Sequence, residues 1–234
     1  MITLQNLTIA HSDKPLIASV NTTFKAATMT VLVGRNGAGK SSLLRVIAGL
    51  DSPKGGEVLI GGKALGKLTP QQRAAQISFV NTQRVRVANL LCRDVVAIGR
   101  APYTNWMGKL QQQDIDAVTA ALEAVGMADF ATRPINTLSD GEAQRVMIAR
   151  ALAQQTPIIV LDEPTAFLDI PTRFEICQLL ASLAHTAGKT ILFSTHDIDS
   201  SIPVADCVAI VENGDLQLLQ APKAKQAIEA LFAL

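Results

Sequence analysis

The chain has 234 residues, which is long enough to bury a sizeable core as one large domain or as one domain with an inserted lobe. Its 21 Lys and Arg residues against 20 Asp and Glu residues give a formal net charge of +1 without a basic block, so we expect no nucleic-acid partner. Hydrophobic residues make up 48% of the chain, yet no apolar run approaches the roughly 18 residues of a membrane span. We therefore expect some apolar surface to contact another protein.

The N-terminus and the cysteines both indicate a cytoplasmic chain. Residues 1–6 lack the basic start, apolar core and small-residue cleavage site of a secretory signal. Cys92, Cys177 and Cys207 are widely scattered and lack metal-ligand spacing, which is typical of reduced thiols buried as small hydrophobic side chains.

The first strong motif lies between a strand and a helix. Residues 30–33 predict a buried strand, and residues 42–47 have the periodicity of an amphipathic helix. Between them, residues 34–41 read GRNGAGKS and fit the phosphate-binding pattern G-x-x-x-x-G-K-[ST]. A plain glycine-rich turn is the alternative, which the flanking strand and helix disfavour. The motif therefore predicts a nucleotide site.

The residue types of this loop suit a nucleoside triphosphate. The glycines permit a tight backbone path, and the helix start offers N–H groups and a positive dipole end. Lys40 adds a positive charge for the β- and γ-phosphates, and the Ser41 hydroxyl would hold Mg²⁺. The residues of this segment expected to bind the nucleotide are Gly34, Arg35, Asn36, Gly37, Ala38, Gly39, Lys40, Ser41 and Ser42.

Further β-branched and aliphatic runs predict strands at residues 58–60, 158–161, 190–193 and 208–211, with helical patterns between several of them. This layout is typical of an α/β fold with buried, mostly parallel strands. The glycine pairs at residues 55–56 and 61–62 are expected to mark turns in the β-rich N-terminal part.

The middle of the chain, from about residue 84 to 155, predicts an inserted helical lobe. Residues 114–125 place Ile115, Val118, Leu122 and Val125 on one helical face, ahead of Gly126. Later in the lobe, the segment LSDGE predicts a helix start in which Ser139 is the N-cap and Glu142 completes a capping box. A free helix N-terminus also binds anions, so this segment could face a phosphate.

Two later strands end in polar residues. The strand at 158–161 leads into Asp162 and Glu163, which would order Mg²⁺ and polarise the attacking water of a phosphate-loop ATPase. The strand at 190–193 leads toward His196, whose imidazole could contact a γ-phosphate. A solvated acidic pair and an ordinary structural histidine are the alternatives, which the phosphate loop disfavours.

The order of these motifs resembles the ATPase subunit of an ABC transporter over essentially the whole chain. The motifs are GRNGAGKS, Gln83, LSDGE with QRVMIARAL, IIVLDEP, residues 166–169 and STHD. The resemblance implies an α/β, RecA-like P-loop NTPase core with a mostly parallel sheet, an antiparallel β part and an inserted helical subdomain. Residues 1–234 would form a single ABC ATPase domain, with the core at about 1–83 and 156–234 and the helical subdomain at about 84–155.

The resemblance also implies a homodimer that encloses two ATP molecules. Ser139 and Gly141 of one copy would face the γ-phosphate held by Lys40 of the other, and hydrolysis would require the dimer. Glu142 belongs to the same nucleotide-binding segment, and Asp169 matches the aspartate at the dimer contact. The implied catalytic residues are Lys40, Gln83, Glu163 and His196, and the implied Mg²⁺ residues are Ser41, Gln83 and Asp162.

The chain departs from the family pattern at two positions. His11 stands where the family usually stacks an aromatic ring on adenine, and an imidazole can also stack. Asp140 stands where the signature usually has glycine, which adds a negative charge near an incoming phosphate. We expect the Asp140 side chain to point aside, because its charge suits a helix N-terminus but not a nearby phosphate.

The chain most resembles the subfamily that powers importers of iron-siderophore complexes, haem or cobalamin, through residues 99–103 and Asp114. The implied partners are an integral membrane permease and, indirectly, a periplasmic or surface substrate-binding protein, with the ATPase peripheral on the inner face of the membrane. Tyr103, Trp106 and Met107 could dock this permease or pack within the lobe.

Two other functions stay open. One is a soluble ABC ATPase that acts on a protein scaffold or DNA, although the lack of basic patches disfavours DNA. The other is a regulatory module that binds ATP without hydrolysing it, which the presence of Glu163 and His196 disfavours.

Overall fold

The computed structural model describes residues 1–11, 14–81, 89–104, 108–224 and 227–228, and of residues 11 and 14 only the backbone. Its strands are β1 (Ile2–His11), β2 (Lys14–Phe24), β3 (Met29–Gly34), β4 (Gly55–Ile60), β5 (Lys63–Ala64), β6 (Ile77–Val80), β7 (Ile158–Asp162), β8 (Thr190–Ser194), β9 (Cys207–Glu212) and β10 (Asp215–Gln220). Its helices are α1 (Lys40–Ile47), α2 (Pro70–Ala74), α3 (Cys92–Ala97), α4 (Gln112–Ala124), α5 (Asp140–Ala153), α6 (Ile170–His185) and α7 (Ile198–Ser201). Short 3₁₀ turns include η2 (Ile98–Tyr103).

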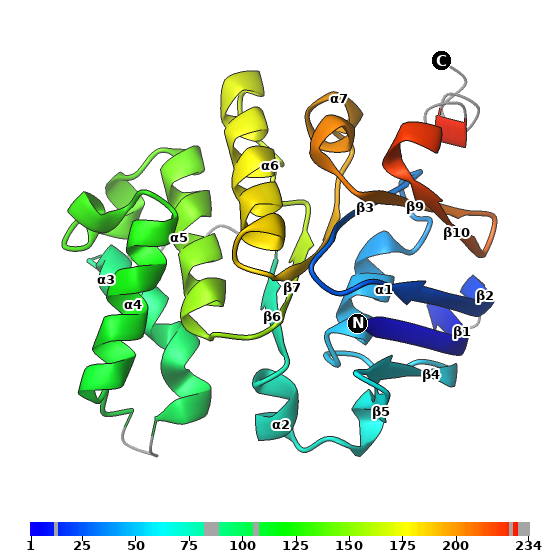
Figure 1. Ribbon diagram of the computed structural model, residues 1–234, viewed down its shortest axis with the longest axis horizontal. Helices are drawn as coiled ribbons and strands as arrows, with labels where there is room; N and C mark the ends of the chain where they lie inside the picture. Colours follow the sequence, from blue (N-terminus) through cyan, green and yellow to red (C-terminus); the bar gives the residue numbers. More distant parts are fainter. Residues whose placement is uncertain (12–13, 82–88, 105–107, 225–226, 229–234) are drawn as a thin grey trace.

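The central sheet has the strand order β10-β9-β3-β8-β7-β6. Neighbouring strands pair in parallel except for the antiparallel hairpin of β9 and β10. The carboxyl ends of β3, β7 and β8 therefore lie at one edge of the sheet, which is where ligands collect in open α/β folds. The phosphate loop leaves β3 at this edge (Figure 1).

Both faces of this sheet are buried, and its strands alternate between two hydrophobic cores. In β7, Ile159 and Leu161 contribute to the core shared with α5 and α6, whereas Ile158 and Val160 contribute to the core shared with α1 and β1. The side-chain period of 2 along a strand causes this alternation. Burial on both faces explains why the strands read as continuous apolar runs in the sequence.

A second sheet, in the order β2-β1-β4-β5, is antiparallel and packs on the α1 side of the central sheet (Figure 1). The predicted turn at residues 55–56 is wrong, because both glycines lie in β4. The pairing of β1 with β4 shifts between Gln5 and Thr8, and a Cβ on Gly56 would lie 2.2 Å from the Asn6 carbonyl oxygen. Glycine at 56 permits this irregularity, whereas residues 61–62 form the predicted turn.

Helices α3, α4 and α5 pack together beside the central sheet (Figure 1). The α4 helix buries Val118 and Leu122 as predicted, but Ile115 is 47% exposed. The buried face is rotated toward Asp114, whose carboxylate pairs inside the lobe with Arg100. The predicted fold class is confirmed: a mostly parallel α/β core, an antiparallel part and inserted helices. The domain limits given above stay a prediction.

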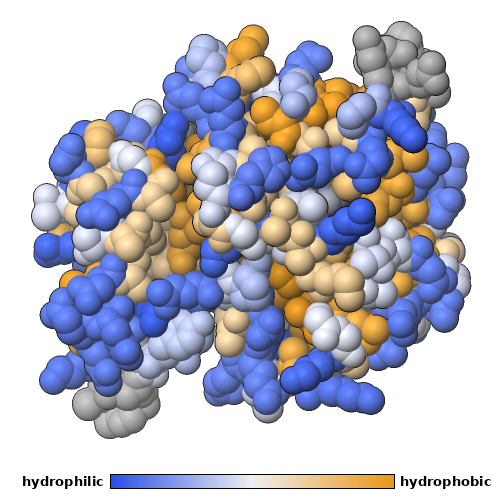
Figure 2. Space-filling model, in the orientation of Figure 1, coloured by the Kyte–Doolittle hydropathy of each residue, from blue (hydrophilic) through white to orange (hydrophobic). Residues whose placement is uncertain are grey.

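The surface of the molecule and the three cysteines can be compared with what the sequence predicts. Hydrophilic residues cover much of the face in Figure 2, and apolar residues lie between them and at the upper outline over α6. The three cysteines are buried free thiols, as predicted, and burial raises the pKa of Cys177 to about 12. No helix within the described ranges has the length and apolar character needed to cross a membrane.

Candidate active site

The phosphate loop connects β3 to α1 along a path that requires glycine. A Cβ on Gly34 would lie 2.5 Å from the Val211 carbonyl oxygen in β9, so the loop leaves the sheet through a close backbone approach. Gly39 is the N-cap of α1 with φ of +102°, a conformation that side chains other than glycine rarely adopt. Among the described residues no side chain caps this helix start, and the helix dipole favours an anion there.

Lys40 folds back over the loop and is buried. Its Nζ donates to the carbonyl oxygens of Gly34 at 2.8 Å and Arg35 at 3.2 Å. Burial lowers the pKa of Lys40 below the ordinary lysine value, and the nearby carboxylates of Glu163 and Asp162 oppose this shift. The loop therefore holds a positive charge at its centre in a defined position.

Asp162 joins this loop to the neighbouring strands. Its Oδ1 accepts a hydrogen bond from the Ser41 hydroxyl at 2.9 Å and another from the Ser194 hydroxyl at 2.6 Å. The Ser194 hydroxyl in turn accepts from the Glu163 backbone N–H at 3.0 Å. Ser194 was not predicted to belong to the site, and no local signal distinguishes it from other polar residues at strand ends.

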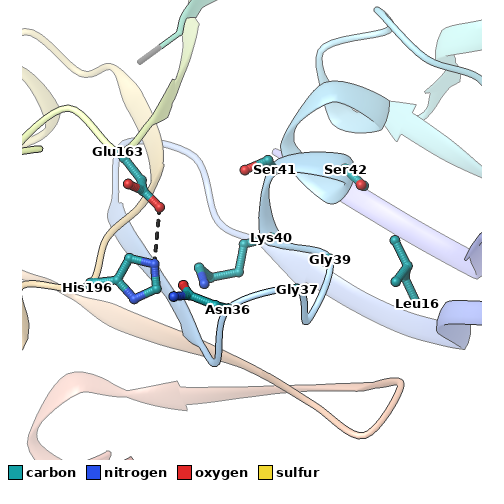
Figure 3. A pocket seen from close by; sticks show the side chains of 9 residues that line it. All are labelled: Leu16, Asn36, Gly37, Gly39, Lys40, Ser41, Ser42, Glu163 and His196. Carbon is teal, nitrogen blue, oxygen red and sulfur yellow. Dashed lines mark ion pairs between the residues drawn. The ribbon is translucent and has the colours of Figure 1, made fainter. Parts of the chain in front are cut away.

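The side chains of Glu163 and His196 contact each other beside the loop. The Nε2 of His196 lies 3.1 Å from Oε1 of Glu163, and Figure 3 shows the two side chains meeting next to Lys40. Glu163 has φ of +48°, which is uncommon for a residue other than glycine, asparagine or aspartate. A backbone conformation of this kind costs free energy and persists only where the surrounding structure holds it in place, as at many active sites.

Side chains from the phosphate loop, the end of β7 and the segment after β8 line one pocket of about 340 Å³. Its lining is Leu16, Asn36, Gly37, Gly39, Lys40, Ser41, Ser42, Glu163 and His196 (Figure 3). The structure thus brings together residues predicted from three separate motifs. Leu16 in β2 was missed, because its place opposite the loop depends on how β2 packs on Gly39 and not on a local pattern.

The LSDGE segment lies at the start of α5 and does not line this pocket. The Ser139 hydroxyl accepts from the Glu142 backbone N–H at 3.3 Å, and Glu142 Oε2 accepts from the Ser139 N–H at 2.8 Å, so the predicted capping box is present. A Cβ on Gly141 would lie 2.5 Å from Thr172 Cγ2 in α6. Asp169 caps α6 by accepting from the Thr172 N–H at 2.9 Å, which places the two helix starts side by side.

Some predicted residues lie outside what the structure describes. Gln83, Trp106 and Met107 are outside the described residues, and His11 ends β1 with only its backbone described. Tyr103 is 41% exposed, yet its hydroxyl donates to the Gln154 carbonyl oxygen at 2.8 Å.

The parallel sheet, the uncapped helix start and the buried lysine define a phosphate-loop nucleotide-binding protein. The family model for ABC transporters matches residues 17–166. The probable siderophore transport system ATP-binding protein of Bacillus subtilis (strain 168) is 38% identical over 198 residues, which cover 85% of this chain and 72% of that protein. The iron(3+)-hydroxamate import ATP-binding protein of the same organism is 33% identical over 213 residues, which cover 91% and 79%.

A solved structure supports the same assignment. This structure is of a dimeric ATP-binding cassette in a post-hydrolysis state, bound to ADP and Pi. Its sequence is 29% identical to this chain, the TM-score is 0.80, and the match covers 94% of this chain and 99% of that one. This chain belongs to the ABC transporter family, and it is an ATP-binding ATPase of that family.

We predict that Gly34→Ala destabilises the fold and weakens ATP binding together. The added Cβ would meet the Val211 carbonyl oxygen, and relieving that contact moves the carbonyl that holds Lys40. We expect a loss of about 1–3 kcal/mol in the free energy of unfolding, measured in urea, and weaker binding by titration calorimetry. Gly66→Ala is the control, because its Cβ would have no neighbour within 4 Å and the residue lies in a short 3₁₀ turn away from the loop. Equal ATP affinity in Gly34→Ala and the native chain would contradict the prediction.

Proposed function

We propose that this chain is the ATP-binding and ATP-hydrolysing subunit that energises an importer of iron-siderophore complexes, haem or cobalamin. The observation that carries the proposal is the convergence of Lys40, Ser41, Glu163 and His196 on one pocket, with Asp162 bonded to Ser41. The names of the two Bacillus subtilis relatives, which concern siderophore and iron-hydroxamate transport, support the choice of cargo class.

The nucleotide would lie with its phosphates on the loop. Residues 34–42 would wrap the phosphates through backbone N–H groups, and Lys40 would turn its ammonium toward the β- and γ-phosphates. The base would extend toward β1 and β2, where His11 would stack on adenine. Leu16 adds an apolar surface on this side of the pocket.

The residues at the end of β7 fit a magnesium ion. The Ser41 hydroxyl and the Asp162 carboxylate are hard oxygen ligands already 2.9 Å apart, and Gln83 would add a third. Among the described residues there is no cluster of three or more His, Cys, Asp or Glu side chains that would hold a metal alone, so phosphate oxygens would complete the shell. Bound there, Mg²⁺ would neutralise charge on the phosphates.

Hydrolysis would use Glu163 and His196 beside the loop. The Glu163 carboxylate would orient a water and accept its hydrogen bond as the water attacks the γ-phosphorus, giving ADP and phosphate. The His196 imidazole, held 3.1 Å from Glu163, would contact the γ-phosphate. Positioning and charge stabilisation would supply most of the rate, as is general for phosphoryl transfer.

A second copy of the chain would complete each site. The described residues that line the pocket include none from the lobe, while Ser139, Gly141 and Glu142 form a helix start outside that lining. Beside them, Phe167 and Ile170 flank Asp169 and are 71% and 72% exposed, an apolar surface that a dimer contact would bury. The dimeric cassette structure of a relative supports this arrangement.

Two copies would then act on a permease at the inner face of the membrane. ATP binding would close the dimer and move the permease, and hydrolysis would reset it. The substrate-binding protein would act indirectly, through the permease.

A mixing experiment tests the composite site. Lys40→Ala and Ser139→Arg should each abolish turnover when present in both copies, because each removes one half of every site. An equal mixture should regain about a quarter of native turnover, since half of the dimers would then hold one intact site out of two. Phosphate release measured before and after mixing checks this. No recovery, with both variants folded by circular dichroism, would contradict a site shared between copies.

Capture from membranes tests the importer assignment. A tagged Glu163→Gln chain, purified with ATP from detergent-solubilised membranes of its native cell, should carry a polytopic permease with it. The tag alone is the control. Recovery of only soluble scaffold proteins or nucleic acid would contradict the transport function while leaving the ATPase chemistry intact.

A further inference from the structure

A buried ion pair lies in the lobe, far along the chain from the phosphate loop. Arg100 in η2 and Asp114 in α4 are only 4% and 1% exposed, and Arg100 Nε donates to Asp114 Oδ1 at 2.9 Å. Burying two charges costs free energy unless each finds further partners. None of the roles proposed above uses this pair, so its other contacts are informative.

Those contacts connect the start of α4 with the end of α5. Arg100 Nη1 donates to the Ala153 carbonyl oxygen and to Gln155 Oε1, both at 2.8 Å. The last carbonyls of a helix lack partners within the helix, and a cation suits its negative end. Asp114 Oδ2 accepts from the Gln111 backbone N–H at 2.9 Å, which caps the start of α4.

The same helix end is also fastened to the central sheet. The Gln154 side-chain amide donates to the carbonyl oxygens of Ala74 and Ile77, and Arg150 Nη2 donates to that of Phe79 in β6 at 3.0 Å. Just beyond, the chain enters β7, which ends at Asp162. The C-terminal end of α5 is therefore the joint between the lobe and the strand that carries the acidic residues.

The opposite end of α5 carries Ser139 as its cap. The helix has 14 residues, which corresponds to a length of about 21 Å. A tilt of about 5° at the joint would therefore move Ser139 by about 2 Å. A misplacement of about 1 Å can cost roughly a hundredfold in rate at a site that must be preorganised.

We propose that Arg100 is a positioning residue for α5. Through its bonds to Asp114 and to the last carbonyl of α5, Arg100 sets the orientation of that helix, and the Ser139 end of the helix then faces the ATP of the partner copy. This inference rests on the proposed function, because it requires Ser139 to act across a dimer. Arg100 touches no nucleotide in this scheme. Tyr103 supports it, with its ring centroid 4.2 Å from the Arg100 guanidinium.

The test uses the full chain with Arg100→Met and Asp114→Asn combined. Removing both charges avoids leaving one buried and unpaired, so the fold should persist. The amide oxygen introduced at position 114 would still accept from the Gln111 N–H, whereas the contacts of Arg100 with the end of α5 and with the Tyr103 ring would be lost. The matched control is Arg93→Met with Asp94→Asn, a neighbouring pair in the same lobe whose side chains are 54% and 50% exposed.

Three measurements separate positioning from general damage. We expect kcat to fall about 10- to 100-fold with KM within about twofold. In a Glu163→Gln background, ATP affinity should stay within about twofold of the parent, while ATP-induced dimerisation, measured by light scattering, weakens about tenfold or more. The control pair should match the parent in all three.

Unchanged kcat and unchanged dimerisation in the double variant would overturn the inference. So would a parallel loss of ATP affinity and dimerisation, because the pair would then maintain the whole fold and not one helix orientation. If the Glu163→Gln chain with native Arg100 fails to dimerise with ATP, the proposed dimeric site itself fails, and the inference falls with it.

Discussion

The geometry of the pocket at the sheet edge depends on one carboxylate oxygen. Oδ1 of Asp162 accepts from both Ser41 and Ser194, so the end of β7, the start of α1 and the end of β8 meet at a single atom. Hydrogen bonds to a carboxylate are stronger than those between neutral groups, so they restrict the geometry of these three elements. Because these elements are held here, the buried Lys40 charge and the Glu163–His196 pair face the same pocket.

The proposed site needs a second copy because the LSDGE helix start lies outside the pocket lining. In the proposed function, the sheet edge would supply charge, metal ligands and the water-orienting carboxylate, whereas the helix start at Ser139 lies outside the lining of this pocket. We infer that the orientation of this helix start is set at the far end of α5, where Arg100 bonds to the Ala153 carbonyl and Gln154 bonds to the carbonyl of Ile77 in β6.

The sequence predicted the parts of the site that local patterns encode. The run into Asp162 is apolar because β7 is buried on both faces, and the loop at Lys40 has a spacing that phosphate binding demands. The glycine pair at residues 55–56 predicts a turn, but both residues lie in β4. The sequence does not reveal this, because the irregularity that needs glycine arises only when β1 pairs with β4. The apolar periodicity of α4 predicts a buried Ile115, but this residue is 47% exposed. The prediction fails because apolar periodicity does not show that the charged Asp114 lies on the buried face. Leu16 joins the pocket through nonlocal packing alone.

The most direct measurement is steady-state ATP hydrolysis by Glu163→Gln, with ATP binding followed in parallel. We expect turnover to fall about a hundredfold or more while ATP affinity stays near the native value, because the carboxylate orients water and does not hold the nucleotide. Glu175→Gln, at a surface residue of α6 paired with Arg145, should hydrolyse ATP at the native rate. Near-native turnover in Glu163→Gln would contradict the assignment of Glu163, and with it the catalytic site described for this pocket.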